Sequence, residues 1–161
     1  MVTEIDLWAI KTRIKDILEN DTTLNDYFRD FHLGAPSGNV GEGQPMPYLF
    51  VTNDEGLIEE DEEASTVQDD VPVTSRHVLH FMIVYMIAEK DGPTTEKALD
   101  DIGKTIKEVL KTNHHLKHPV TNDLPMAFRS FPEETRPLNT AKLGQEVQGR
   151  VLFFKVTQYT S

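Results

Sequence analysis

The chain contains no cysteine, and apolar residues never form a long uninterrupted run. Without cysteine, neither disulfides, thiolate zinc sites nor cysteine nucleophiles can form. No run approaches the roughly 18 apolar residues that a membrane-spanning helix needs. Charged residues interrupt the apolar pattern of residues 1–20, which does not fit a secretory signal. We therefore expect a soluble, intracellular protein with no membrane partner.

Positive charge is also scarce: 16 Lys and Arg residues stand against 27 Asp and Glu residues, giving a formal net charge of −11. A general nucleic-acid binder needs cations that replace the counterions condensed on phosphates, and this chain repels phosphates on average. Net charge does not exclude a local basic patch. The composition therefore argues against DNA or RNA binding through a broad basic face.

Sequence motifs for phosphate binding and nucleophilic catalysis are missing as well. The glycine-rich stretch 34–43 has no Lys-Ser/Thr ending, and no GxSxG elbow occurs. The acidic run 54–63 does not match a calcium loop, because Leu57 and Ile58 interrupt the ligand positions. We expect a solvated, charged loop there, with a diffuse divalent-cation site between subunits as the alternative.

The histidines His114 and His118 are four residues apart, a spacing that places two imidazoles on one helix face. A zinc site needs a third ligand, and the HExxH pattern of zinc proteases is absent. We favour the alternative that these are basic side chains that close a helix before Pro119 and interact with its C-terminal dipole. We expect no enzyme, cofactor, catalytic residue or metal site. A small metal-dependent or acid–base enzyme using His114 and His118 is the alternative.

Hydrophobic periodicity predicts the secondary structure. An amphipathic helix follows a cap at Thr3, with Asp6 three residues later, and its apolar stripe ends at Leu18. A short second helical turn is expected at residues 24–31. Residues 48–52 (YLFVT) form a short apolar run that is typical of a strand.

The segment 76–89 is the clearest strand, and its apolar residues on both faces predict an interior position in a sheet. A long helix is expected at 94–116, followed by strands at 125–131 and 147–159. The aromatic residues of these strands are predicted to pack in the core; they are Phe81, Tyr85, Phe153 and Phe154.

Together these elements predict one α+β domain over residues 1–161. Its fold is a small mixed or antiparallel β-sheet flanked by two main α-helices. Two polar stretches have little to bury: an acidic, mobile excursion at 54–75 and a second arm at 131–146. We expect both to form long hairpin or loop arms.

The order of these elements is similar to that of a known family. The strand PYLFV, the central strand HVLHFMIVYMIAE, the helix TTEKALDDIGKTIKEVLKTNHHL and the closing strand LGQEVQGRVLFFKVTQYT carry the resemblance. The chain resembles, from about Ile5 to Tyr159, the tail terminator (tail completion) proteins of long-tailed bacteriophages, the lambda-type terminator family. The resemblance rests on element order, without a diagnostic catalytic or ligand motif.

This resemblance implies a virion protein at the head-proximal end of the tail, assembled in the host cytoplasm. Such proteins form a hexameric ring that caps the tail tube, stops polymerisation of the tube protein and presents the surface on which the filled head docks. Its partners would be other copies of the chain, the tail tube protein and the head–tail connector or neck proteins. DNA would pass through the ring without specific binding, past an acidic lumen bordered by part of residues 54–63. Another neck or head–tail joining protein is the alternative.

Ring closure joins one patch of a subunit to a different patch on the next. The acidic run and four arginines are the candidates for the subunit interface or the channel, and the arginines would set register more than strength. The candidate residues are Asp54, Glu55, Glu59, Glu60, Asp61, Glu62, Glu63, Arg76, Arg129, Arg136 and Arg150.

Overall fold

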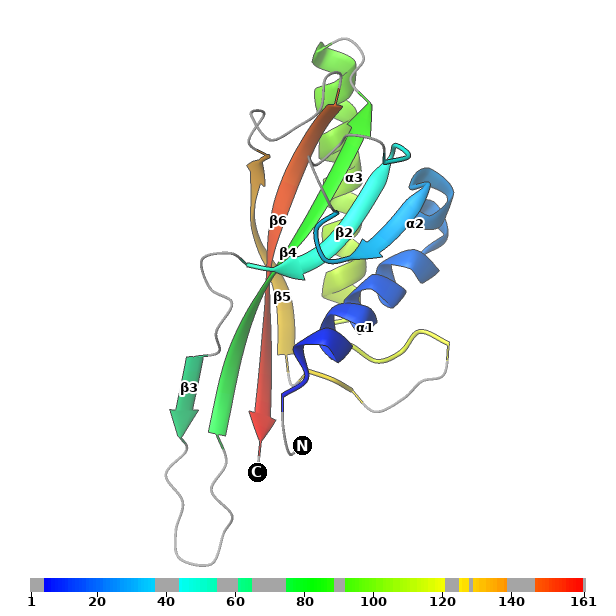
Figure 1. The fold of residues 1–161 in the computed structure, drawn as a ribbon. Coiled ribbons are helices and arrows are strands. Elements are labelled where there is room, and N and C mark those ends of the chain that lie inside the picture. Colours follow the sequence, from blue (N-terminus) through cyan, green and yellow to red (C-terminus); the bar gives the residue numbers. More distant parts are fainter. Residues whose placement is uncertain are drawn as a thin grey trace, which may run out of the picture.

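The computed structural model describes residues 5–36, 44–54, 61–64, 75–88, 92–120, 125–127, 129–138 and 147–160. Within these ranges the chain forms one mixed β-sheet and three α-helices (Figure 1). The predicted α+β class is confirmed. The elements, in chain order, are α1 (Leu7–Asn20), α2 (Thr22–Tyr27), β1 (Asp30–Leu33), β2 (Tyr48–Asn53), β3 (Asp61–Ala64), β4 (Ser75–Ala88), α3 (Gly92–Thr112), β5 (Arg129–Pro137) and β6 (Val147–Thr160).

The sheet is organised around β4 and β6, which pair antiparallel along all 14 residues of each strand. At about 3.4 Å per residue, such a strand spans roughly 45 Å. Strand β5 pairs with the other edge of β6. On the other edge of β4, β2 pairs with residues 81–86 and β3 with residues 75–78, while β1 lies parallel to β2. The predicted interior position of β4 is therefore confirmed.

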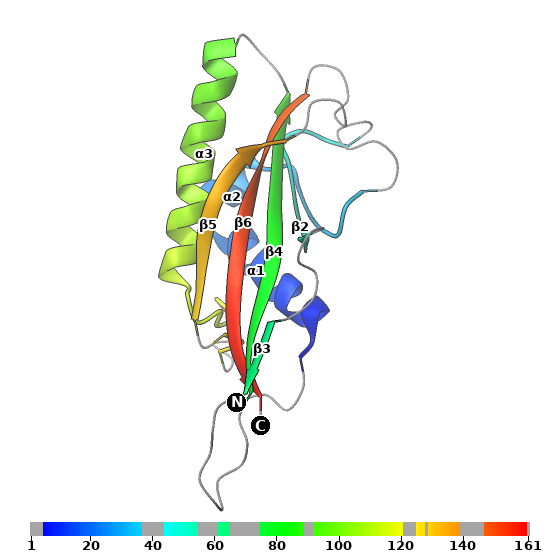
Figure 2. The same ribbon diagram turned by 90° about the vertical axis from the view of Figure 1, so that its left-hand side faces the viewer.

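One face of the sheet carries the main hydrophobic core. Alternate residues of β4 point to this face, where Phe81, Ile83 and Tyr85 are fully buried. They pack with the apolar stripes of α1 and α3, and Figure 2 shows α3 running along this face beside β5 and β6. None of the helices that the structure places is long and apolar enough to cross a membrane.

The opposite face of the sheet, which we call the outer face, carries a second and smaller apolar cluster. It lies over β2, β4 and β6. Its buried members are Tyr48, Phe50, Val84, Met86, Val147 and Val151. Apolar residues on both faces of β4 therefore serve two separate clusters, as the sequence pattern of that strand indicates.

The start of the chain differs in detail from the prediction. Helix α1 is capped by Asp6, whose carboxylate accepts a hydrogen bond from the backbone N–H of Ala9 at 2.9 Å. Thr3, the predicted cap, lies outside the described residues. The second helix ends at Tyr27, because residues 30–33 instead pair with β2 as a strand.

Two predicted arms contain strand residues. Within the excursion 54–75, Asp61–Ala64 forms β3 and pairs with β4. Within the arm 131–146, the strand β5 continues as far as Pro137, although its side chains are largely exposed. That strand begins at Arg129 rather than at residue 125. Polar edge strands such as these give little hydrophobic periodicity, which explains why the sequence pattern missed them.

The buried Tyr85 makes the fold sensitive to alkaline pH. Burial raises the pKa of Tyr85 to about 12; nearby Asp100 raises it further and Arg150 opposes the shift. The neutral phenol is the form that the core accepts, so the native state holds its proton longer than the unfolded chain does. Stability from this group is present below pH 10 and is lost as pH rises toward 12.

We therefore expect Tyr85→Phe to flatten the loss of stability at alkaline pH. Between pH 9.5 and 12, the wild-type protein should lose about 2 to 3 kcal/mol more than the variant, from 1.36 kcal/mol per pKa unit. Urea unfolding at a series of pH values measures this difference. Tyr159→Phe, in the half-buried end of β6, serves as the control. Equal slopes for wild type and Tyr85→Phe would contradict the assignment.

Candidate assembly surface

The part of the outer face over β5 and β6 carries cations and aromatic rings side by side. Strand β5 contributes Arg129, Phe131 and Arg136, and strand β6 contributes Phe153 and Lys155. The pairing register places Phe131 opposite Lys155 and Arg136 opposite Val151, so these side chains share one face. We call these five residues the cationic surface.

The cations of this surface lie over the rings. The Lys155 ammonium is 4.8 Å and the Arg129 guanidinium 5.4 Å from the ring centroid of Phe131. The Arg136 guanidinium is 5.2 Å from the ring centroid of Phe153. Such contacts contribute roughly 0.5–1 kcal/mol each at exposed sites. They orient the charges of Arg129 and Arg136 while both side chains remain exposed to solvent.

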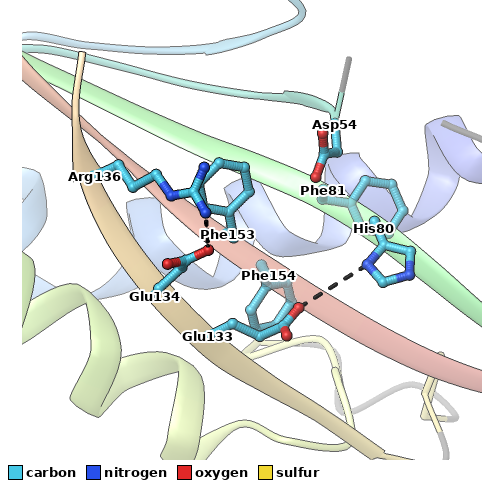
Figure 3. A pocket seen from close by; sticks show the side chains of 8 residues that line it. All are labelled: Asp54, His80, Phe81, Glu133, Glu134, Arg136, Phe153 and Phe154. Carbon is cyan, nitrogen blue, oxygen red and sulfur yellow. Dashed lines mark hydrogen bonds and ion pairs between the residues drawn. The ribbon is translucent and has the colours of Figure 1, made fainter. Parts of the chain in front are cut away.

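A pocket of about 380 Å³ adjoins the cationic surface where β5 is irregular. The register of β5 and β6 shifts between Pro132 and Thr135, which leaves Glu133 and Glu134 without partners opposite them in the ladder. Figure 3 shows the side chains around this pocket. The lining residues are Asp54, His80, Phe81, Glu133, Glu134, Arg136, Phe153 and Phe154.

Several polar and charged side chains around this pocket lie close to one another. Arg136 donates to the Glu134 carboxylate at 2.6 Å, and His80 Nδ1 lies 4.0 Å from Glu133 Oε1 (Figure 3). Asp54 is fixed at the end of β2 by its backbone N–H, which donates to the carbonyl of His80 at 3.3 Å. These groups present both signs of charge in a small area of the outer face.

Strand β3 places part of the acidic run at one end of the sheet. Its residues Asp61, Glu62 and Glu63 pair in register with Val78, His77 and Arg76 of β4, respectively. Figures 1 and 2 show this end of β3, β4 and β6 extending beyond α3. Of the other acidic candidates, Asp54 lines the outer pocket, while Glu55, Glu59 and Glu60 lie outside the described residues.

The four arginine candidates are divided between the two faces of the sheet. Arg129 and Arg136 belong to the cationic surface, and Arg76 shares its strand face with His80. Arg150 lies on the helix-side face instead. Its guanidinium donates to the carboxylate of Asp100 in α3 of the same subunit.

The histidines predicted to share a helix face do not do so, because α3 ends at Thr112. In the following turn the ring centroids of His114 and His115 are 4.0 Å apart, with their planes tilted by 47°. His118 Nε2 lies 3.9 Å from the Asp16 carboxylate. Among the residues that the structure describes, no group of three or more His, Asp or Glu side chains is arranged to hold a metal ion. The backbone carbonyl of His114 accepts a hydrogen bond from the Ser130 hydroxyl at 2.8 Å. This part of the chain joins α3 to β5.

Sequence reasoning missed most of the cationic surface. It predicted Phe153 as core, whereas this residue is only half-buried and lies on the outer face; Phe81, Tyr85 and Phe154 are buried as predicted. Residues two apart in a strand share a face, so the sequence VLFFKV already indicates that Phe153 and Lys155 lie on the same face of the sheet. Phe131 was not predictable in this way, because its face depends on pairing with β6.

A scan of the chain against protein-family models finds no match, and a search of curated proteins finds none either.

The Arg150–Asp100 ion pair is expected to stabilise the subunit measurably, because Arg150 is only 22% exposed. A double-mutant cycle of Arg150→Ala and Asp100→Ala should give a coupling energy of roughly 0.5–1 kcal/mol in chemical denaturation. The matched control is Lys97–Asp101, an exposed pair one turn apart in the same helix, whose coupling should be smaller. Zero coupling for Arg150 and Asp100 would leave this arginine available to a neighbouring subunit.

Proposed function

We propose that this chain is a structural virion protein that forms a ring on the head-proximal end of a bacteriophage tail tube. In this role it stops polymerisation of the tube protein and provides the surface on which the head docks. The resemblance of its element order to tail terminator proteins motivates the proposal. The mixed sheet with helices against one face agrees with the fold that this resemblance implies.

One observation favours assembly over a monomeric role: strand β3 and the cationic surface of β5 lie at opposite edges of the sheet, with only Arg76 of β4, among the arginines, placed directly opposite the acidic strand, at Glu63. Asp61, Val78, Thr157 and Arg129 form one row across the sheet, in that order. Strands lie about 4.8 Å apart, so the backbones at Asp61 and Arg129 are separated by roughly 14 Å. In an ion pair the charged atoms lie within about 4 Å of each other. Two strands lie between Asp61 and Arg129, so a direct ion pair within one subunit is difficult to form.

The β3 end of one copy and the cationic surface of another copy can meet, because no intervening strands of one sheet keep them apart. A heterologous contact joins unlike patches and, repeated with a closing rotation, generates a ring. We propose that the acidic β3 end of one subunit meets the cationic surface of the next. Individual exposed ion pairs contribute little, so the charges would chiefly select the register and orientation of the contact.

Reversing charge on the cationic surface should weaken self-association. We expect the double variant Arg129→Glu, Arg136→Glu to shift the concentration midpoint of assembly upward by about tenfold or more, because acidic regions would then face one another. Sedimentation velocity and light scattering over a range of protein concentrations measure the mass.

A matched control variant makes the same change in net charge at positions outside the cationic surface. Lys97→Glu, Lys117→Glu alters two exposed lysines outside the cationic surface and should assemble like the wild type. Equal weakening in both double variants would indicate a net-charge effect and contradict the proposed contact. A wild-type protein that stays monomeric at every concentration would contradict the ring.

Capping of tubes tests the function itself. Added to polymerising tail tube protein, the chain should shorten the tubes in proportion to its concentration, with length distributions measured by electron microscopy. A neck protein that joins heads to finished tails would leave tube length unchanged and bind only tubes that are already capped. That second result would replace the terminator function with the neck alternative.

A further inference from the structure

A second pocket of about 380 Å³ lies on the helix-side face, between α3 and the strands β4, β5 and β6. It shares no lining residue with the pocket on the outer face. Tyr85, Thr135 and Arg150 reach it from three different strands, and α3 contributes the opposite wall from Leu99 to Lys111. Figure 2 shows how α3 runs alongside β5 and β6 here.

Two hydroxyl groups line this pocket, on Tyr85 and Thr135. The Thr135 Oγ1 atom is buried and makes no hydrogen bond. The Tyr85 side chain is buried as well. Buried polar groups are normally hydrogen-bonded, and leaving one unpaired costs free energy. An unpaired buried hydroxyl with a second hydroxyl in the same pocket points to a ligand that accepts hydrogen bonds.

Gly103 of α3 allows the tyrosine hydroxyl to reach this position. A Cβ atom added at Gly103 would lie 2.5 Å from Tyr85 Oη, closer than non-bonded atoms approach. Because burial raises the pKa of Tyr85 to about 12, the hydroxyl keeps its proton at neutral pH and can donate it. A larger residue at position 103 would therefore require the phenol to shift away from its position in the pocket.

The rim of the pocket is cationic, in contrast to the chain as a whole. Lys104, Lys107 and Lys111 line it from α3. Their spacing of three and four residues places them along one helix face. None of the three makes an ion pair or hydrogen bond with another residue that the structure describes. Arg150 also lines the pocket, although it pairs with Asp100, and Glu108 is the other carboxylate there.

We propose that this pocket binds a small, multiply charged oxyanion bearing phosphate or carboxylate groups. One anionic group accepts hydrogen bonds from the hydroxyls of Tyr85 and Thr135, and the remaining charge lies among the three lysines. Hydroxyl and ammonium groups are donors, and oxyanions supply several strong acceptors to match them. This site is independent of ring assembly, since it lies on the other face of the sheet from the cationic surface.

Titration calorimetry with pyrophosphate and with citrate, at constant ionic strength, tests the site. The wild-type protein should bind one anion per chain, and the better of the two probes identifies phosphate or carboxylate as the preferred chemistry. The variant Tyr85→Phe, Thr135→Val removes only the two hydroxyls and should bind roughly tenfold more weakly or worse. The variant Lys104→Gln, Lys107→Gln should weaken binding and reduce its dependence on salt.

Matched variants separate the site from general charge effects. Lys97→Gln, Lys117→Gln removes the same charge outside the pocket and should bind like the wild type. Thermal unfolding verifies that each variant is folded. If loss of the hydroxyls prevents folding, the variant of Lys104 and Lys107, neither of which is fully buried, still decides the outcome. The proposal is overturned if neither probe binds saturably at millimolar concentration, or if the control pair loses as much affinity as the pocket lysines.

Discussion

The antiparallel ladder between β4 and β6 is the constraint on which the rest of the structure depends. Its register fixes which residues of both strands face the helices and which face outward, because a slip of one residue would exchange the two faces. Gly149 of β6 shows how closely this pairing is packed: a Cβ atom there would lie 2.8 Å from the Met86 side chain and 3.0 Å from the carbonyl of Tyr85. Strands β2, β3 and β5 pair directly with one of these two, and β1 pairs with β2.

Because both faces of the ladder are fixed together, one sheet carries two surfaces of different chemistry. On the helix side, Tyr85 and Thr135 bring hydroxyls into the pocket beneath α3, beside the main apolar core. On the outer face, Phe153 and Lys155 hold rings and charges that remain partly exposed. The faces are separated by a single layer of backbone, so a substitution can alter one surface while it leaves the other intact.

Sequence periodicity predicted the parts of the fold that bury apolar side chains. The helices α1 and α3 and the strands β2, β4 and β6 were predicted close to their observed bounds, since each carries a regular apolar pattern. The strands β1, β3 and β5 lie at sheet edges, where backbone hydrogen bonds stabilise strands whose side chains carry little signal. The candidate sites were harder to predict for the same reason: Arg150 and Arg129 look alike in sequence. Only the pairing of Arg150 with β4 and of Arg129 with β6 assigns them to opposite faces.

The distribution of charge matters more for association than the net value of −11. An evenly acidic surface would repel copies of itself at any orientation. Among the described residues, groups of cations lie on the outer face of β5 and β6 and along one side of α3. Asp61, Glu62 and Glu63 lie at the β3 end of the sheet, where Arg76 is directly opposite Glu63. General repulsion then disfavours most encounters between copies, and only an orientation that brings unlike regions together is attractive. For a protein proposed to close into a ring, this combination favours one contact geometry over all others.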